Sequence, residues 1–464
     1  MFTKFNRVVI LGAGPAGLAA ARVALFEFGI ARVEMYDQGK HPLPSYSSCL
    51  APLLNFQNST GGIGGSTSGG WGGQLAELSL ETLSEWQSHD NGFSEDAIKA
   101  LRLASAELVS DFDLIKMNSE LIEINPIFED MEGNQINKSY TYYSEEKNLE
   151  IRYRDVINDS RFSLVEKRVT RIDCFENCLK LFSNEELIEI PENTLLIIAL
   201  GCIETTQIIL RSFPIAAHNF QVGVGVRDHP ATYLYTFKTK RFATDTPNFG
   251  QFVSRKVKYE VCSKFGGRNR RPGIFEVQEI HNQFILNGEL QLKKLTSTEL
   301  FRNKLKSAFR HFLPTTVFNF LFVREFVIWA QLEQAPDESR LLFLKGDYIA
   351  STWQLNSSDI QGFAEVAKIS KDWLDTFQLE FGCVIDLDSL IELPVANFQA
   401  AHPSGTIKVN NERDLAIADC YGRMHDYPQI VIASSAIFPS DGWMNPTLAV
   451  MAYSISATRK ALGN

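Results

Sequence analysis

The sequence predicts an α/β protein that combines a Rossmann-like nucleotide-binding fold with an α+β part containing an antiparallel sheet. The first is indicated by the order strand, glycine-rich turn, helix, strand over residues 7–37. The second is indicated by alternating polar and apolar residues from Tyr233 to Lys240, and by strand-like segments at Phe275–Ile280 and Phe284–Leu295. A helical apolar pattern follows from Asp359 to Phe377.

The composition is that of a folded chain with a large core. Of the 464 residues, 45% are hydrophobic and 22% are charged, which excludes disorder for the bulk of the chain. The formal net charge of −10 argues against a dedicated nucleic-acid binder, because such proteins usually carry a basic surface. No run of about 18 uncharged apolar residues is present, and no leader-like segment precedes Val8, so we expect a cytoplasmic protein.

The cysteines are few and scattered. All seven lie far apart except Cys174 and Cys178, and no second close pair follows at the spacing of a zinc finger. We therefore expect neither a disulfide framework nor a metal site.

The N-terminal motif provides the elements of a dinucleotide site. The strand-like run at 7–11 leads directly into the turn, which reads Gly12-Ala13-Gly14-Pro15-Ala16-Gly17. Gly12 allows a tight turn, Gly14 lets the backbone approach a pyrophosphate, and Gly17 lets the helix pack on the strand. The second strand ends at Asp37, which can accept hydrogen bonds from ribose hydroxyls. An acid at this position favours FAD or NAD(H) over NADP(H).

A second glycine cluster follows at residues 61–73, with eight glycines in thirteen positions. The embedded Ile63 and Trp71 are unusual for a flexible linker. Backbone without side chains can approach a ligand closely and offer N–H donors, so the cluster is interpreted as a second wall of the same site. The residues expected to contact the cofactor here are Gly64, Gly65, Ser66, Thr67, Gly70, Trp71 and Gly72.

With these clusters, the chain resembles the glucose–methanol–choline (GMC) oxidoreductases, a family of FAD enzymes. Four later segments are similar to motifs of that family, in family order: LLIIALGCIETTQIIL at 195–210, VGVGVRDHP at 222–230, HPSGT at 402–406 and IVIASSAIFPSDGWMNPTL at 430–448. The stretch QAPDESR at 334–340 also resembles one that precedes the strands of the family's substrate domain.

The resemblance implies a discontinuous FAD-binding domain. Residues 1–85, 160–235 and 396–464 would form it, and residues 86–159 and 236–395 would form the substrate-binding domain and its cover. Further cofactor contacts are implied at Val169, Ser434, Asn445, Pro446 and Thr447.

The resemblance also implies a catalytic pair, His402 and Asn445. An alcohol donates hydride poorly until its O–H proton is removed, and a neutral imidazole can remove it. The asparagine N–H can stabilise the developing alkoxide while hydride passes to flavin N5. The expected function is oxidation of an alcohol, of sugar or polyol type, to a carbonyl by a dehydrogenase or oxidase. The electron acceptor stays open between O2, a quinone and a protein.

Two departures from the family pattern affect the cofactor. Members with covalently attached FAD carry a histidine inside the second glycine cluster, where this chain has glycine near Gly69, so we expect non-covalent FAD. The family's aspartate after the C-terminal strand is replaced by Ser434, which retains a hydroxyl for hydrogen bonding.

Two alternatives and two surface features stay open. The same fold can serve a non-redox lyase that uses His402 as base, or a catalytically silent FAD-binding protein. The basic stretch Lys304–Phe312 is compatible with core burial, a cover or peripheral membrane contact. A basic turn at Gly266–Pro272 is compatible with a solvated loop or an anionic substrate.

Overall fold

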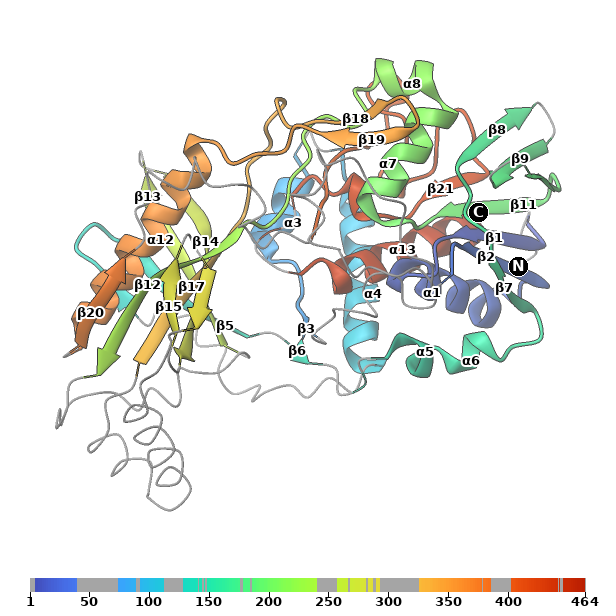
Figure 1. Ribbon diagram of the computed structural model, residues 1–464. Helices are drawn as coiled ribbons and strands as arrows, with labels where there is room; N and C mark the ends of the chain where they lie inside the picture. The colour runs from blue at the N-terminus through green and yellow to red at the C-terminus, as the bar shows by residue number, and fades with distance from the viewer. Residues whose placement is uncertain are drawn as a thin grey trace.

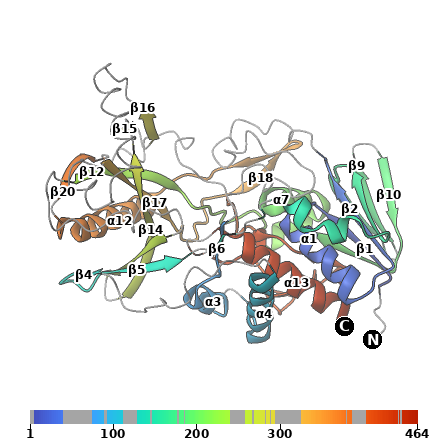
Figure 2. The same ribbon diagram turned by 90° about the horizontal axis from the view of Figure 1, so that it is seen from below.

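The computed structural model describes residues 5–39, 74–140 and 142–239 in large part, and then most of 257–292, 325–384 and 402–463. Figure 1 shows two lobes, one built around a parallel sheet and the other around an antiparallel sheet. The view from below in Figure 2 separates the same elements, with both chain ends in the parallel lobe.

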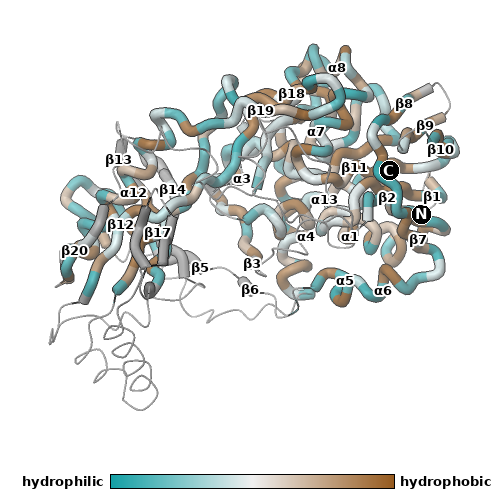
Figure 3. Tube along the Cα trace, in the orientation of Figure 1, coloured by the Kyte–Doolittle hydropathy of each residue, from teal (hydrophilic) through white to brown (hydrophobic). Residues whose placement is uncertain are grey.

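A five-stranded parallel sheet forms the centre of the first lobe. In spatial order it contains β21 (Ile430–Ile432), β11 (Thr194–Ile198), β1 (Arg7–Leu11), β2 (Arg32–Asp37) and β7 (Phe162–Glu166). Every neighbouring pair runs parallel. The apolar runs of β1 and β11 are buried, as expected for parallel strands covered on both faces. Figure 3 shows this apolar character along β11, next to β1 in the sheet.

Helices join the two ends of the chain beside this sheet. The described helices of this lobe are α1 (Pro15–Arg22), its π-helical continuation η1 (Val23–Glu27), α3 (Leu80–Trp86), α4 (Glu95–Asp111), α5 (Leu149–Arg152), α6 (Arg154–Ile157), α7 (Gly201–Ser212), α8 (Pro214–Asn219), the short 3-10 helix η4 (Ser435–Ile437) and α13 (Thr447–Gly463). Helix α13 packs against both α1 and α4. The N-terminal motif and the C-terminal tail are therefore neighbours in the folded chain.

Small sheets complete this lobe. One is a three-stranded antiparallel sheet of β8 (Arg171–Phe175), β9 (Cys178–Ser183) and β10 (Glu186–Ile190). Another is a hairpin of β18 (Leu342–Lys345) and β19 (Tyr348–Ser351). Both pack against α7, the first through β8 and the second through β18. The pair β3 (Gln74–Leu75) and β6 (Tyr142–Tyr143) lies between the lobes in Figure 1.

A seven-stranded antiparallel sheet forms the second lobe. Its order is β20 (Leu379–Val384), β12 (Ala231–Thr239), β17 (Glu325–Leu332), β14 (Arg268–Ile280), β13 (Val257–Phe265), β5 (Gln135–Tyr140) and β4 (Phe128–Glu129). Helix α12 (Ser357–Asp375) packs on this sheet, and β15 (Gln283–Leu286) pairs with β16 (Glu289–Leu292) as a separate hairpin. The predicted fold class, α/β with a parallel central sheet and a second antiparallel sheet, is confirmed.

One local prediction is wrong. Arg268, Arg270 and Arg271, expected in a turn, lie in strand β14, because β13 and β14 pair from Phe265 and Arg268 onward. The stretch Lys304–Phe312 lies outside the described residues. Among the helices described, none is both long and apolar enough to span a lipid bilayer.

The packing also bears on the expected division into domains. Strands β4 and β5, from the 86–159 segment, join the seven-stranded sheet, whereas α4 from the same segment packs against α13. The residue boundaries of the two domains stay a prediction.

Candidate functional site

The turn between β1 and α1 depends on glycine at position 12. Gly12 adopts a φ of +100°, and a Cβ there would lie 2.5 Å from the carbonyl oxygen of Ala199. Its N–H donates to the carbonyl of Tyr36 at 2.8 Å, which fixes the turn against β2. The backbone is thereby turned back toward the sheet just before α1.

The first turn of α1 leaves open space beside Gly14. Gly14 is the N-cap residue, no side chain caps the helix, and Pro15 begins it. A Cβ on Gly14 would meet no atom of the described residues within 4 Å, whereas a Cβ on Gly17 would lie 2.0 Å from the carbonyl oxygen of Gly12. Gly17 thus serves close packing. The N–H groups of the first helical turn and the positive end of the helix dipole are suited to an anionic ligand beside Gly14.

Asp37 lies at the end of β2 and holds this turn. Its Oδ2 accepts from the backbone N–H of Ala13 at 2.9 Å, and its Oδ1 accepts from that of Gly39 at 3.0 Å. A carboxylate has further lone pairs, so it can also accept hydrogen bonds from a ligand hydroxyl.

The other expected cofactor contacts are only partly described. Gly64, Gly65, Ser66, Thr67, Gly70, Trp71 and Gly72 lie outside the described residues. Val169 is buried between β7 and β8. Ser434 is fully buried after β21, where its Oγ accepts from the N–H of Ala436 at 3.1 Å and so caps η4.

Ala16 and Thr447 are placed where the two ends of the chain meet. The carbonyl of Ala16 accepts from Ser454 Oγ of α13 at 2.7 Å. Thr447 is buried at the start of α13, and the carbonyl of Pro446 accepts from Val450 N–H at 2.8 Å. Asn445 is half-buried immediately before this helix.

His402 lies in a loop that runs antiparallel to the segment around Arg227. The backbone of Ser404 pairs with that of Arg227 through two hydrogen bonds, at 3.0 and 3.2 Å. The N–H of His402 donates to Oδ1 of Asp228 at 2.9 Å. The same oxygen accepts from the N–H of His229 at 2.6 Å. A single buried carboxylate therefore fixes the backbone at both histidines.

A second imidazole lies beside His402. The ring centroids of His229 and His402 are 5.7 Å apart, and Nε2 of His229 is 2.7 Å from the carbonyl oxygen of Gly442. His229 is 2% exposed, whereas His402 is half-buried. A carbonyl can only accept, so this bond requires that Nε2 of His229 carries a proton.

Arg227 connects the two C-terminal loops of the site. Its guanidinium donates to the carbonyls of Phe438, at 2.7 Å, and Pro439. It also fills the space beside Gly405, where a Cβ would lie 2.1 Å from its nitrogen. The 402–407 loop is bonded directly to the next one, since Ile407 N–H donates to Ala436 at 2.8 Å and Ser435 Oγ donates to Pro403 at 3.0 Å.

The contact of Asp228 with His402 could not be predicted from the sequence. Asp228 stands in Arg227-Asp228-His229-Pro230, which resembles a family segment, but its contact with His402 joins positions 174 residues apart. Gln334 begins the QAPDESR stretch, but its contact with Asp228, whose N–H donates to Oε1 of Gln334 at 2.9 Å, is likewise evident only in the structure.

The segment that leads from Gln334 to β18 and the first turn of α12 each hold one perturbed carboxyl group. Hydrogen bonds from the Ser339 side chain and backbone lower the pKa of Asp337 to about 2. Burial raises the pKa of Asp359, although the neighbouring Arg340 opposes this shift. The ion pair of Arg340 with Asp359 is almost fully buried and hydrogen-bonded.

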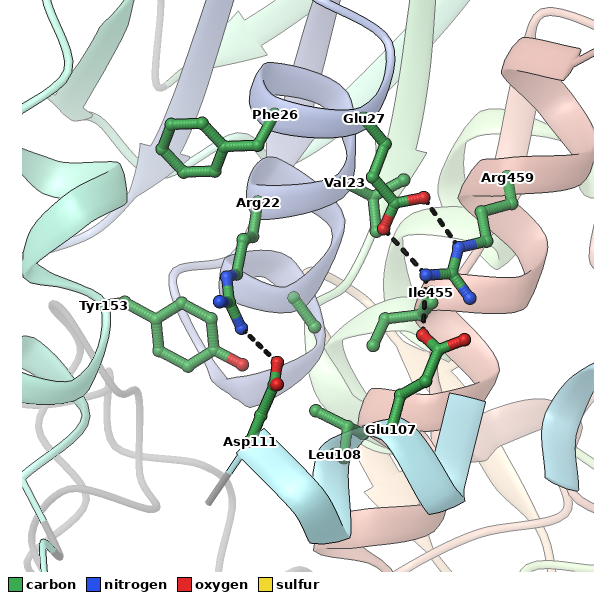
Figure 4. Close-up of a pocket in the computed structure, with 11 residues that line it drawn as sticks. Arg22, Val23, Phe26, Glu27, Glu107, Leu108, Asp111, Tyr153, Ile455 and Arg459 are labelled. Carbon is green, nitrogen blue, oxygen red and sulfur yellow. Dashed lines mark hydrogen bonds and ion pairs between the residues drawn. The ribbon is translucent and has the colours of Figure 1, made fainter. Parts of the chain in front are cut away.

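A separate pocket of about 190 Å³ lies on the outer side of α1, away from the histidines. Figure 4 shows its polar residues directed toward one another, with Arg22 paired to Asp111 and Arg459 paired to Glu27 and Glu107. We interpret it as a packing junction between helices. Within the described part of the chain, no cluster of three or more His, Cys, Asp or Glu side chains is arranged to hold a metal ion.

Part of the chain matches a known protein family. Residues 361–454 match the family model described as GMC oxidoreductase. No curated protein sequence matches the chain.

Solved structures match the whole chain at low sequence identity. Pyridoxine 4-oxidase from Mesorbium loti is 12% identical with a TM-score of 0.59, and 98% of each chain is covered. Formate oxidase is 11% identical with a TM-score of 0.62 and the same coverage; its Aspergillus oryzae RIB40 variant R554K, studied for FAD modification, is 12% identical with a TM-score of 0.60. A fungal aryl-alcohol oxidase is 13% identical with a TM-score of 0.53, covering 100% of this chain and 99% of the other.

The resemblance to the GMC oxidoreductases is thereby confirmed: the chain has the GMC oxidoreductase fold along its length and matches the family model over residues 361–454.

Proposed function

We propose that this protein is an FAD-dependent oxidoreductase that converts an alcohol, of sugar or other polyol type, to a carbonyl compound. The observation that carries the proposal is the contact of the 402–407 loop, which bears His402, with the segments 435–439 and 227–230. Asn445 lies later in the same C-terminal segment, immediately before α13. The solved relatives support the reaction class, since their names describe oxidases of pyridoxine, formate and aryl alcohols.

The residues around the β1–α1 turn fit FAD. The space beside Gly14 and the uncapped N-terminus of α1 suit a pyrophosphate, and Asp37 suits a ribose. Ser434, Asn445, Pro446 and Thr447 would hold the flavin end from the C-terminal segments. FAD would supply the hydride acceptor. We propose that it is held non-covalently.

The chain's own residues would handle the proton and the oxygen of the alcohol. The imidazole of His402 would take the O–H proton, while the C–H hydrogen leaves as hydride and the C–O bond becomes a carbonyl. The side-chain N–H of Asn445 would donate to the oxygen as its negative charge develops. Asp228 would keep the backbone of His402 in place throughout.

The test begins with the purified protein and its visible spectrum. Anaerobic mixing with a panel of polyols should bleach the flavin band for at least one of them, and admission of air then shows whether O2 is the acceptor. In the His402→Ala variant, the alcohol should reduce the flavin at a rate about 10² to 10⁴ times lower than in the wild type. The matched control is His218→Gln, which replaces an exposed histidine at the end of α8. In this variant the flavin should be reduced at the wild-type rate.

Other outcomes identify the alternatives. Substrate conversion with no bleaching would indicate a lyase, and a yellow protein that no alcohol reduces would indicate a silent FAD-binding protein. A colourless protein that takes up no FAD would contradict the proposed cofactor.

A further inference from the structure

A chain of buried hydrogen bonds connects helix α12 of the antiparallel lobe to His402. Oδ2 of Asp359, in the first turn of α12, accepts from Nε2 of Gln334 at 3.0 Å. Oε1 of Gln334 accepts from the N–H of Asp228 at 2.9 Å. Oδ1 of Asp228 then accepts from the N–H of His402 at 2.9 Å. Three consecutive contacts therefore lead from one lobe to the proposed base.

Every intermediate group in this chain is buried. Asp359, Gln334 and Asp228 are exposed by 5%, 3% and 1%. Arg340, 1% exposed, pairs with Asp359 and donates to the carbonyls of Gln354 and Ala335 as well. Buried polar groups that lose a partner are costly, so these contacts constrain one another.

The partners of Gln334 determine which way its side-chain amide points. Trp353 Nε1 donates to Oε1 at 2.7 Å, and the backbone N–H of Asp228 donates to the same oxygen. Both are donors only, so they require the amide oxygen. The carboxylate of Asp359, paired with Arg340, requires a donor and so faces the amide nitrogen. No other natural side chain of this size offers an oxygen and an NH2 group in this arrangement.

We propose that Gln334 is a positioning residue for His402: by holding Asp228, it fixes the backbone from which the imidazole projects. The proposal rests on the proposed role of His402 as base. Gln334 acts through Asp228. It follows the last residues of β17, so the position of the antiparallel sheet is linked to the placement of the base.

The test measures this positioning directly, in the FAD-loaded protein, by amide hydrogen exchange. Gln334→Met removes the oxygen and the NH2 group at nearly constant size. Peptides that contain the amides of 227–229 and of 402–404 should exchange about tenfold faster, as expected when one hydrogen bond is lost, while α13 stays unchanged.

The matched control is Tyr235→Phe. It removes another buried hydrogen bond of α12, from Tyr235 Oη to Ser370 Oγ at 2.8 Å, that does not lead to His402. It should lower stability without faster exchange at 402–404. Equal acceleration in both variants, or a uniform increase along the chain, would overturn the proposal.

A second variant decides the question if Gln334→Met does not fold. Gln334→Glu keeps an oxygen for Asp228 and Trp353 but places a carboxylate against Asp359, so the same amides should again exchange faster. Unchanged exchange at 228, 229 and 402 in this folded variant would overturn the proposal.

Kinetics add a readout that general destabilisation does not reproduce. With any alcohol that bleaches the wild-type flavin, both Gln334 variants should show a lower limiting reduction rate at an unchanged half-saturating concentration. Tyr235→Phe should keep both values. A wild type that no alcohol reduces would contradict the proposed function, and the exchange result would still decide the positioning role.

Discussion

Three glycines of the β1–α1 turn serve different physical purposes. Gly12 needs its positive φ, Gly17 needs the absence of a Cβ to approach the carbonyl of Gly12, and Gly14 needs neither. The φ of Gly14 is −75° in extended backbone that any residue can adopt, and open space lies beside it. Among the described residues nothing occupies this space, so a glycine at position 14 is suited to leaving room for a ligand.

This difference gives a prediction at the residue scale. Gly14→Ala should leave the stability of the FAD-free protein within about 1 kcal/mol of wild type, because its backbone is compatible with alanine. It should weaken FAD binding about tenfold or more by filling the space of the pyrophosphate. Fluorescence titration with FAD and urea denaturation of the FAD-free protein measure the two effects.

Gly17→Ala is the comparison variant and should behave in the opposite way. Its Cβ would lie 2.0 Å from a backbone oxygen, so unfolding should become easier by about 1–3 kcal/mol even without FAD. Equal losses of stability in both variants would contradict the assignment of Gly14 to ligand binding.

At the scale of elements, one arginine joins three helices. Arg459 of α13 makes two hydrogen bonds of 2.8 Å to Glu27 of η1 and one of 2.7 Å to Glu107 of α4 (Figure 4). The hydrogen bond to Glu27 is the main cause that raises the pKa of Arg459. The π-helical η1 places Glu27 at this junction, as irregular helical turns often do at constrained sites.

We expect the forked geometry of Arg459 to matter more than its charge. Arg459→Lys keeps the charge but loses the bidentate contact, and should lower the free energy of unfolding by about 0.5–1 kcal/mol, a modest value because all three side chains are partly solvated. A double-mutant cycle with Glu27→Gln, by urea denaturation, measures the coupling. Arg413→Lys, in the exposed pair with Asp426, should change nothing. A coupling that vanishes for Arg459 and Glu27 would show that the junction is held by apolar packing alone.

How far the elements could be predicted depends on the range of the interactions that form them. The predicted strand at 7–11 coincides with β1, and the predicted helix at 359–377 lies within two residues of α12, because apolar periodicity is a local signal. The change from α1 to the π-helical η1 at Val23 has no local signal of that kind. The sequence predicted a turn at Arg268, but this residue begins β14, because pairing with β13 rather than local composition decides where that strand begins.

The candidate site shows the same limit. The sequence indicated Gly12, Gly14, Gly17 and Asp37, whose neighbours are close along the chain, and the structure brings them together around one turn. Asp228 and Gln334 lie in segments that resemble family motifs, and Asp359 begins the predicted helix. Their contacts with one another and with His402 could not be predicted, because these contacts arise only from tertiary folding.

At the scale of the whole molecule, the proposed FAD site is assembled from both ends of the chain. The β1–α1 turn comes from the first 20 residues, and the segments after β21 come from residues 433–464. Helix α13 packs directly on α1, and the chain of contacts through Asp228 and Gln334 reaches the antiparallel sheet. A ligand bound at this place should therefore stabilise both lobes.

The resulting prediction concerns thermal unfolding. FAD at about 100 times its dissociation constant should stabilise the folded state by about 2.7 kcal/mol, which for a chain of this size raises the midpoint by about 3 °C. At the same FAD concentration, the unfolding midpoint of the Gly14→Ala variant should rise by less than that of the wild type. Hydrogen exchange then distinguishes the lobes: peptides from β1 and from β17 should both gain protection with FAD. Protection confined to β1 would mean that the buried contacts through Asp228 and Gln334 do not transmit stability between the lobes, and no rise of the midpoint in the wild type would contradict FAD binding itself.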